Sequence, residues 1–164
     1  MVIFLNTLIF IIAYLLDTAS AFDFISVFGV MPDFVFITLV CFCIFYGKER
    51  GLVLAIATGL ITDMVTASPF GAHAIMFLAT AVVCAVTYET IFEKNLWTAL
   101  VTVFVLSFAY NTVTHIFGVF MGGEYSYFHS LWRYILPRCL FNVIITPLLY
   151  KIVGKVYYKN ERIF

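Results

Sequence analysis

Residues 51–73 read GLVLAIATGLITDMVTASPFGAH, and this stretch decides the fold. The apolar run 51–67 is nearly long enough to cross a bilayer as a helix, since a span needs about 20 residues. Ser68–Pro69–Phe70–Gly71 then predicts a hairpin turn, because Pro disfavours helix at the residue before it and Gly permits an unusual backbone angle. A second apolar run, 72–88, follows directly. The stretch therefore predicts two neighbouring membrane helices joined by a tight connection.

The rest of the chain repeats this pattern of apolar runs. Of its 164 residues, 64% are hydrophobic and 11% are charged, and the mean hydropathy is +1.08. A soluble domain usually carries about a quarter charged residues, and a globule of this size cannot hide so much apolar surface. The sequence therefore predicts an all-α polytopic membrane protein with no folded domain outside the bilayer. Six transmembrane helices in one domain, 1–164, are predicted at about 2–22, 24–46, 51–67, 72–88, 96–120 and 131–153.

The charged residues predict the orientation of these spans. Most Lys and Arg residues follow the second, fourth and sixth spans, whereas the connections on the other side are mainly acidic. Because an excess of Lys and Arg marks the cytoplasm, both termini are predicted to be cytoplasmic. The formal net charge is zero, so nucleic-acid binding has no support.

The N-terminal span has two interpretations. Ala19–Ser20–Ala21 resembles a signal-peptidase site after an apolar run, but residues 1–16 contain no positive charge. A signal peptide begins with a positively charged region, so we predict that the first span is retained. Cleavage after Ala21 is the alternative.

Polar residues that interrupt the apolar runs are the candidate site. They are Asp63, His73, Asn111, His115, Arg138 and Asn142. All six are predicted in the half of the membrane away from the termini, where a lone Asp or Arg costs about 2.5–3.5 kcal/mol on insertion scales. We therefore predict an ion pair between Asp63 and Arg138 in an intramembrane polar cluster. The cluster is interpreted as a structural lock between helices, as a small-ligand pocket, or as side chains that reach the outer surface separately.

Two further groups of residues have structural interpretations. Gly51, Ala55 and Gly59 recur every four residues, a spacing that lets helix backbones approach closely, with another span of this chain as the predicted partner. Pro32 and Asp33 precede the second span and predict a helix cap. The sequence contains no metal-ligand spacing, phosphate-binding loop or nucleophile motif. We therefore predict no catalytic residue, no cofactor, no metal and no enzymatic activity.

The order of these features resembles the MreD family of rod-shape-determining inner-membrane proteins. The resemblance rests on Pro32–Asp33, on the block from Gly51 to Gly71, and on Arg138, Asn142 and residues 147–150 before a basic end. It implies a six-helix fold similar to the substrate-binding S components of energy-coupling-factor transporters. It also implies a role in the bacterial cell-elongation complex, with MreC and the membrane helices of peptidoglycan synthases as partners and MreB as an indirect one.

Two functions therefore remain open. The first is a scaffold of the cytoplasmic membrane that binds partner helices within the lipid bilayer. The alternative is a small-solute-binding S component, with the polar cluster as its pocket. The intervals between Ala13, Ala19 and Ala21 do not form the Ala-xxx-Ala docking pattern of such components, which favours the scaffold. The turn Gly47–Lys48–Glu49–Arg50 departs from the plainly basic turn that is common in the resembled family.

Overall fold

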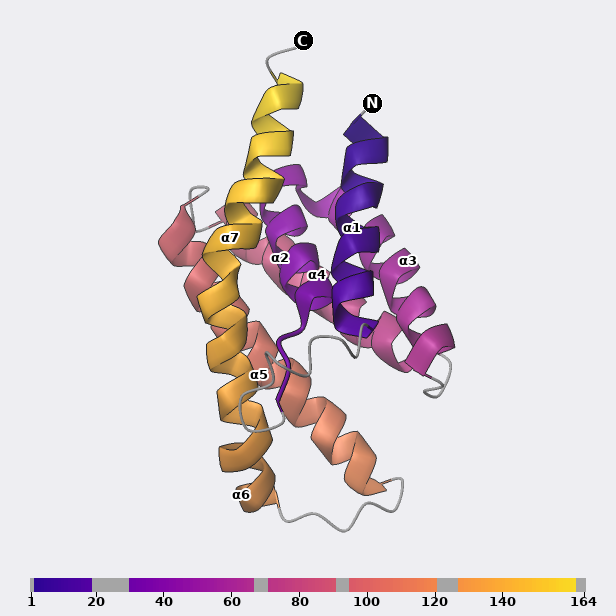
Figure 1. The fold of residues 1–164 in the computed structure, drawn as a ribbon, viewed down its shortest axis with the longest axis vertical. Coiled ribbons are helices and arrows are strands. Elements are labelled where there is room, and N and C mark those ends of the chain that lie inside the picture. Colours follow the sequence, from indigo (N-terminus) through magenta and orange to yellow (C-terminus); the bar gives the residue numbers. More distant parts are fainter. Residues whose placement is uncertain (1, 19–29, 67–70, 91–94, 121–126, 162–164) are drawn as a thin grey trace.

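The protein is an all-α bundle. The computed structural model describes residues 2–18, 30–66, 71–90, 95–120 and 127–161, and Figure 1 shows their arrangement. The helices in chain order are α1 (Val2–Thr18), α2 (Phe34–Tyr46), α3 (Lys48–Thr66), α4 (Ala72–Thr90), α5 (Leu96–Phe120), α6 (Tyr127–Ser130), the π-helical stretch η2 (Leu131–Ile135) and α7 (Leu136–Glu161).

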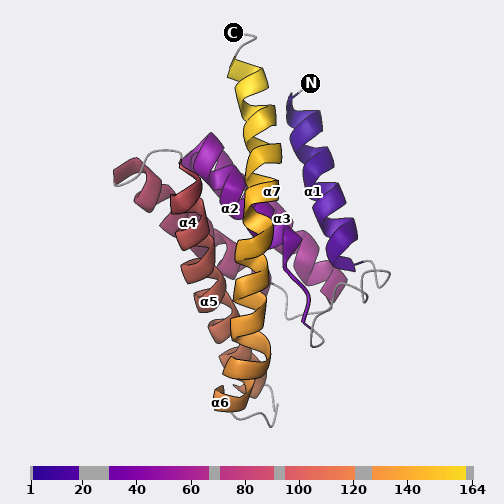
Figure 2. The ribbon, with the colours of Figure 1, turned by 60° about the vertical axis from the view of Figure 1, so that its left-hand side comes forward.

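The two ends of the bundle differ in which parts of the chain they contain. Both chain termini and the connection between α2 and α3 lie at one end, which we call the terminal end, and α6 lies at the other, the far end (Figures 1 and 2). Two helices in the described ranges are long and apolar enough to cross a membrane, Leu96–Phe120 and Tyr127–Lys159. Three shorter apolar helices are Asn6–Thr18, Phe34–Tyr46 and Ala72–Thr87.

Helix α2 forms the centre of the bundle. Every residue from Val35 to Phe45 is buried, and the helix packs against α1, α3, α4, α5 and α7. A helix that is apolar on all sides is expected to be enclosed in this way. At 1.5 Å per residue, its 13 residues span only about 20 Å, less than the hydrocarbon thickness of a bilayer. Asp33, which precedes the helix, is buried, so the N-terminus of α2 lies within the bundle.

Two helix boundaries correct the sequence prediction. The predicted second span, 24–46, is wrong over Met31–Asp33, which are not helical, and residues 24–29 lie outside the described ranges. The helix begins at Phe34 because Asp33 caps it. The helix predicted at 131–153 begins earlier, at Tyr127, and runs through α6 and η2 into α7. Pro137 follows this π-helical stretch and lacks the N–H that regular helical bonding would require.

Small residues of α3 meet two neighbouring helices. A Cβ atom added to Gly59 would lie 2.4 Å from Ala74 Cα in α4, and one added to Gly51 would lie 2.8 Å from Cys43 Sγ in α2. Ala55, between them, is completely buried. The spacing of these residues therefore places α3 directly against both α2 and α4.

The close contact at Gly59 predicts different effects for two Gly-to-Ala substitutions. Gly59→Ala forces the α4 backbone away and is expected to destabilise the protein by about 1–3 kcal/mol. Gly118→Ala in α5 places its Cβ where no atom lies within 4 Å, so it is expected to be neutral or to stabilise by up to about 1 kcal/mol through helix propensity. Thermal unfolding of both purified variants in mild detergent measures the difference. Equal stability of the two would contradict the α3–α4 packing.

Candidate functional site

Side chains bind the backbone N–H groups at the N-terminus of α2. Asp33 is its N-cap: the side chain accepts a hydrogen bond from the Phe36 N–H at 2.9 Å, and the carbonyl accepts one from the Ile37 N–H at 3.0 Å. The N–H of Asp33 itself donates to Oδ1 of Asn142, in α7, at 2.9 Å. Asp33 and Asn142 are both buried. These contacts therefore join the start of α2 to α7 inside the bundle.

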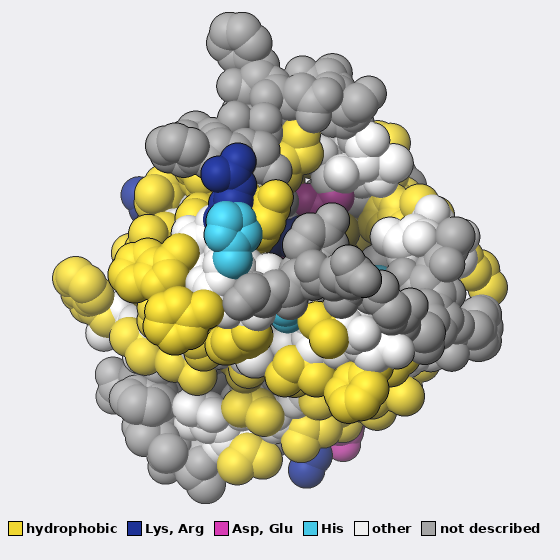
Figure 3. Space-filling model, turned by 90° about the horizontal axis from the view of Figure 1, so that it is seen from below, with side chains coloured by type: hydrophobic (Ala, Val, Ile, Leu, Met, Phe, Trp, Pro, Cys, Tyr) yellow, Lys and Arg dark blue, Asp and Glu magenta, His cyan; other side chains and the backbone are white. Residues whose placement is uncertain are grey.

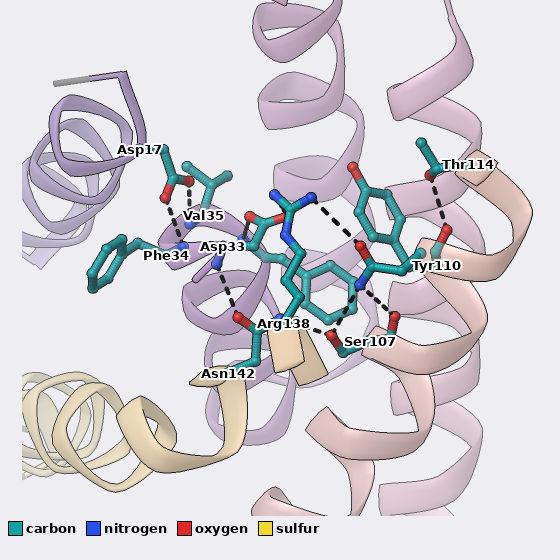
Figure 4. A network of polar contacts seen from close by, with 11 residues as sticks. Asp17, Asp33, Phe34, Val35, Ser107, Tyr110, Thr114, Arg138 and Asn142 are labelled. Atoms are coloured by element: carbon teal, nitrogen blue, oxygen red, sulfur yellow. Dashed lines mark hydrogen bonds and ion pairs between the residues drawn. The ribbon is translucent and has the colours of Figure 1, made fainter. Parts of the chain in front are cut away.

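Asp17, at the end of α1, binds the backbone N–H groups of the first two residues of α2. Its Oδ1 accepts from the Phe34 N–H at 2.8 Å and its Oδ2 accepts from the Val35 N–H at 2.9 Å (Figure 4). The first four N–H groups of an α-helix have no partner within the helix. In α2 all four are bound by side chains. The carboxylates of Asp17 and Asp33 also oppose the positive end of the helix dipole, which favours their charge there.

Ser107 connects this cap to a further helix, α5. Its Oγ accepts a hydrogen bond from Nδ2 of Asn142 at 2.7 Å. Asn111, one turn further along α5, donates through Nδ2 to the Ser107 carbonyl at 2.8 Å and contacts its Oγ at 3.3 Å. Ser107 is completely buried. The contacts therefore continue from α2 through α7 to α5.

Arg138 lies over the cap with longer contacts than its neighbours. Its Nη2 lies 3.8 Å from Oδ2 of Asp33, and its Nη1 lies 3.5 Å from Oδ1 of Asn111. Its Nε has no hydrogen-bond partner among the described residues, and 38% of the side chain is exposed. Arginine carries five N–H donors, so these two contacts use only part of the donors of the guanidinium. We call the whole set the α2-cap network: Asp17, Asp33, Ser107, Asn111, Arg138 and Asn142.

Asp63 forms a separate site at the start of α4. Its Oδ1 accepts from the His73 N–H at 2.8 Å and lies 2.8 Å from the ring Nδ1 of His73. Its Oδ2 accepts from the Gly71 N–H at 2.8 Å and from the Ala74 N–H at 3.4 Å. Asp63 is buried at 2% exposure. A side chain of α3 therefore caps α4, and we call this group the α4-cap cluster.

The predicted ion pair between Asp63 and Arg138 is wrong. Asp63 pairs with His73, and Arg138 pairs with Asp33. Aromatic rings lie between the two sites: Tyr110 stacks on Phe36 with ring centroids 5.1 Å apart, and its ring centroid lies 6.3 Å from that of His73. Asp63 has enough local backbone donors to satisfy its carboxylate without an arginine.

The six polar residues predicted as one cluster are thus divided. Asn111, Arg138 and Asn142 belong to the α2-cap network, and Asp63 and His73 to the α4-cap cluster. His115 belongs to neither: its ring packs edge-on against Tyr127 with centroids 5.7 Å apart, and within the described ranges its Nδ1 and Nε2 have no hydrogen-bond partner.

The residues predicted to form turns and caps have mixed outcomes. Asp33 caps α2 as described, and Pro32 beside it is buried. Gly71 has a positive φ of 95° and donates its N–H to Asp63. Pro69 and the rest of the predicted hairpin, 67–70, lie outside the described residues, as does the Ala19–Ser20–Ala21 segment.

Sequence reasoning missed two members of the α2-cap network. Asp17 falls inside the predicted first span, 2–22, and is not among the candidate site residues, whereas its carboxylate binds the start of α2. Ser107 carries little signal as a lone hydroxyl in an apolar run. Its position one turn before Asn111 is the feature that points to it, because residues four apart share a helix face.

The far end of the bundle is mainly apolar. Figure 3 views it directly: hydrophobic side chains dominate, and acidic side chains lie recessed in a hollow behind them. A groove of about 650 Å³ at this end is lined by Phe128, His129, Trp132, Arg133 and Pro137. Within the described ranges, no group of three or more His, Cys, Asp and Glu side chains is placed to hold a metal ion.

Comparison with known proteins identifies one family. The family model described as rod shape-determining protein MreD matches residues 1–160. No curated protein and no solved structure matches the chain.

Loss of the Asn142 side chain is expected to destabilise the bundle strongly. Asn142→Ala leaves the buried Asp33 N–H without its partner and removes the 2.7 Å hydrogen bond to the Ser107 hydroxyl, at an expected cost of about 2–3 kcal/mol. Asn95→Ala is the matched control, since the exposed Asn95 side chain contacts the Trp97 N–H at a longer 3.4 Å, and a cost within about 1 kcal/mol is expected. Unfolding curves in detergent measure both. A cost for Asn142→Ala no larger than that of the control would contradict the network.

Double-mutant cycles test the pairing of the charged residues. Asp33→Asn with Arg138→Gln, and Asp63→Asn with His73→Phe, are expected to show coupling of at least about 0.5 kcal/mol, because each pair is in contact. Asp63→Asn with Arg138→Gln is expected to be additive. Coupling in the third cycle equal to that in the first would restore the pairing that the structure rejects.

Proposed function

The chain belongs to the MreD family of rod shape-determining proteins, and from that premise we propose that it is a non-enzymatic membrane scaffold of the bacterial cell-elongation complex. In this proposal it binds MreC and the membrane helices of wall-synthesis proteins through the outer faces of its own helices. MreB takes part indirectly, through these partners.

We propose further that the chain crosses the cytoplasmic membrane six times, with both termini in the cytoplasm. The joint position of the termini at one end supports an even number of crossings (Figure 1). Lys48 and Arg50 are exposed, and they begin α3 at this end. Lys151, Lys155 and Lys159 are exposed on the last turns of α7. Such an excess of basic residues supports a cytoplasmic terminal end.

One observation carries the scaffold proposal: three carboxylates bind backbone N–H groups within the bundle, while large apolar side chains point outward. Asp17, Asp33 and Asp63 are bound by backbone N–H groups. Outward-facing side chains include Val53 of α3 at 71% exposure and Ile144 of α7 at 70%. A polar interior that serves as a lock leaves these outer faces as the means of contact with other membrane helices.

A solute-binding function is the second candidate, supported by Arg138. Its side chain is partly exposed, and no described residue pairs with its Nε, as in a site that receives a small ligand. In this alternative the chain is an S component of an energy-coupling-factor-type transporter, with a six-helix fold of that kind. The charge of Arg138 is already opposed by the carboxylate of Asp33, whose Oδ2 lies 3.8 Å from Nη2, and this favours the scaffold.

Site-specific crosslinking in cells tests the scaffold. A photoreactive amino acid at Val53, Val105 or Ile144, which are all exposed, is expected to crosslink MreC or a wall-synthesis protein from at least one face. The matched control is Val103, two residues from Val105 and completely buried, where crosslinks to partners are expected to be absent. Mass spectrometry identifies the crosslinked proteins. Recovery of a transporter ATPase pair in place of wall-synthesis proteins would select the second candidate.

A further inference from the structure

The outward face of α7 changes from apolar to basic along its length. In its first half this face carries Leu140, Ile144 and Leu148, which are 56%, 70% and 62% exposed. These residues are four apart and therefore lie above one another on one side of the helix. Three residues after Leu148, and again four apart, come the exposed side chains of Lys151, Lys155 and Lys159. Because residues three or four apart are neighbours on a helix surface, an apolar ridge continues into a basic one.

The opposite side of α7 holds the helix against the bundle. Asn142, Thr146 and Val153 are buried at 1% exposure or less. Near the terminal end, a Cβ atom added to Gly154 would lie 2.8 Å from the Phe45 ring, and that ring also packs against Tyr150 and Tyr157. Because this side is fixed to α2, the lysines of α7 are directed away from the bundle, toward whatever surrounds the protein.

From these two faces we infer that Lys151, Lys155 and Lys159 form a binding ridge for the headgroups of anionic phospholipids. The chain is a membrane protein by family, so the apolar part of the ridge contacts lipid chains. The change from Leu148 to Lys151 then marks the depth at which chains give way to headgroups. From Lys151 to Glu161, α7 rises a further distance of about 15 Å, through the headgroup layer.

Charge complementarity supports this occupant. Lysine side chains have long apolar stems that lie along lipid while the ammonium group reaches the phosphate level. Each Lys or Arg near an anionic surface contributes about 1 kcal/mol, which corresponds to a factor of about five in association. Glu49, by contrast, lies between Lys48 and Arg50 and offsets the charge of that turn. The ridge is therefore a stronger anion-binding surface than the α2–α3 connection at the same end.

Lipid titration of the full-length protein in mild detergent tests the inference. Short-chain phosphatidylglycerol and phosphatidylcholine are added in turn, and bound lipid is counted by native mass spectrometry. Lys151→Gln with Lys155→Gln is expected to lower the preference for phosphatidylglycerol by about tenfold or more. The matched control, Lys48→Gln with Arg50→Gln, removes the same number of positive charges from the same end but leaves the ridge intact, and it is expected to lower the preference clearly less than the α7 variant does.

Two further measurements distinguish a lipid surface from a site for free phosphate and from a loss of folding. Inorganic phosphate at equal concentration is not expected to displace the bound lipid, since the apolar part of the ridge contributes to binding. Thermal stability is expected to stay unchanged, because the substituted lysines lie on the exposed side of α7. An unaltered preference in the α7 variant, an equal loss in the control, or displacement by phosphate would overturn the inference. The result does not depend on which partner proteins the scaffold binds.

Discussion

The structure depends on one requirement: the backbone N–H groups at the start of α2 need hydrogen-bond partners inside the bundle. A buried N–H without a partner costs about as much as a lost hydrogen bond, and neither lipid nor an apolar core supplies one. At the start of α2, Asn142, Asp17 and Asp33 bind all four free N–H groups. Because these side chains come from α7, α1 and the cap itself, the short central helix can end within the bundle only while its neighbours stay in place.

This constraint links the interior to the surface. The side chains of α7 that reach inward, such as Asn142, fix the rotation of that helix about its own axis. Its outward face is thereby fixed as well, and with it the position of the lysines and of Ile144. The same reasoning applies to α3, where Gly59 sits against α4 and directs Val53 outward. A polar interior therefore defines which apolar surfaces are presented to other molecules in the membrane.

The sequence predicts the helices and their caps better than it predicts which polar residues pair with one another. The apolar run from Gly51, the cap at Asp33 and the four-residue spacing of small residues are local signals, and the structure contains a helix, a cap and close contacts at these places. The pairing of Asp63 with Arg138 is wrong because periodicity gives the face of a residue but not which helix lies opposite. The role of Asp17 could not be predicted for a similar reason. Its partners are backbone N–H groups 17 and 18 residues away, in the next helix.

The division of the polar residues into two sites also bears on mechanism. A single solvated cluster would resemble a solute pocket, whereas the observed sites each close one helix terminus. Within the described part of the chain, the packed rings of Phe36, Phe77 and Tyr110 separate the two sites. Arg138 has spare donors, but the carboxylate of Asp33 beside it would repel an anionic solute and already holds a helix end. The geometry thus favours a rigid bundle that acts through its outer faces.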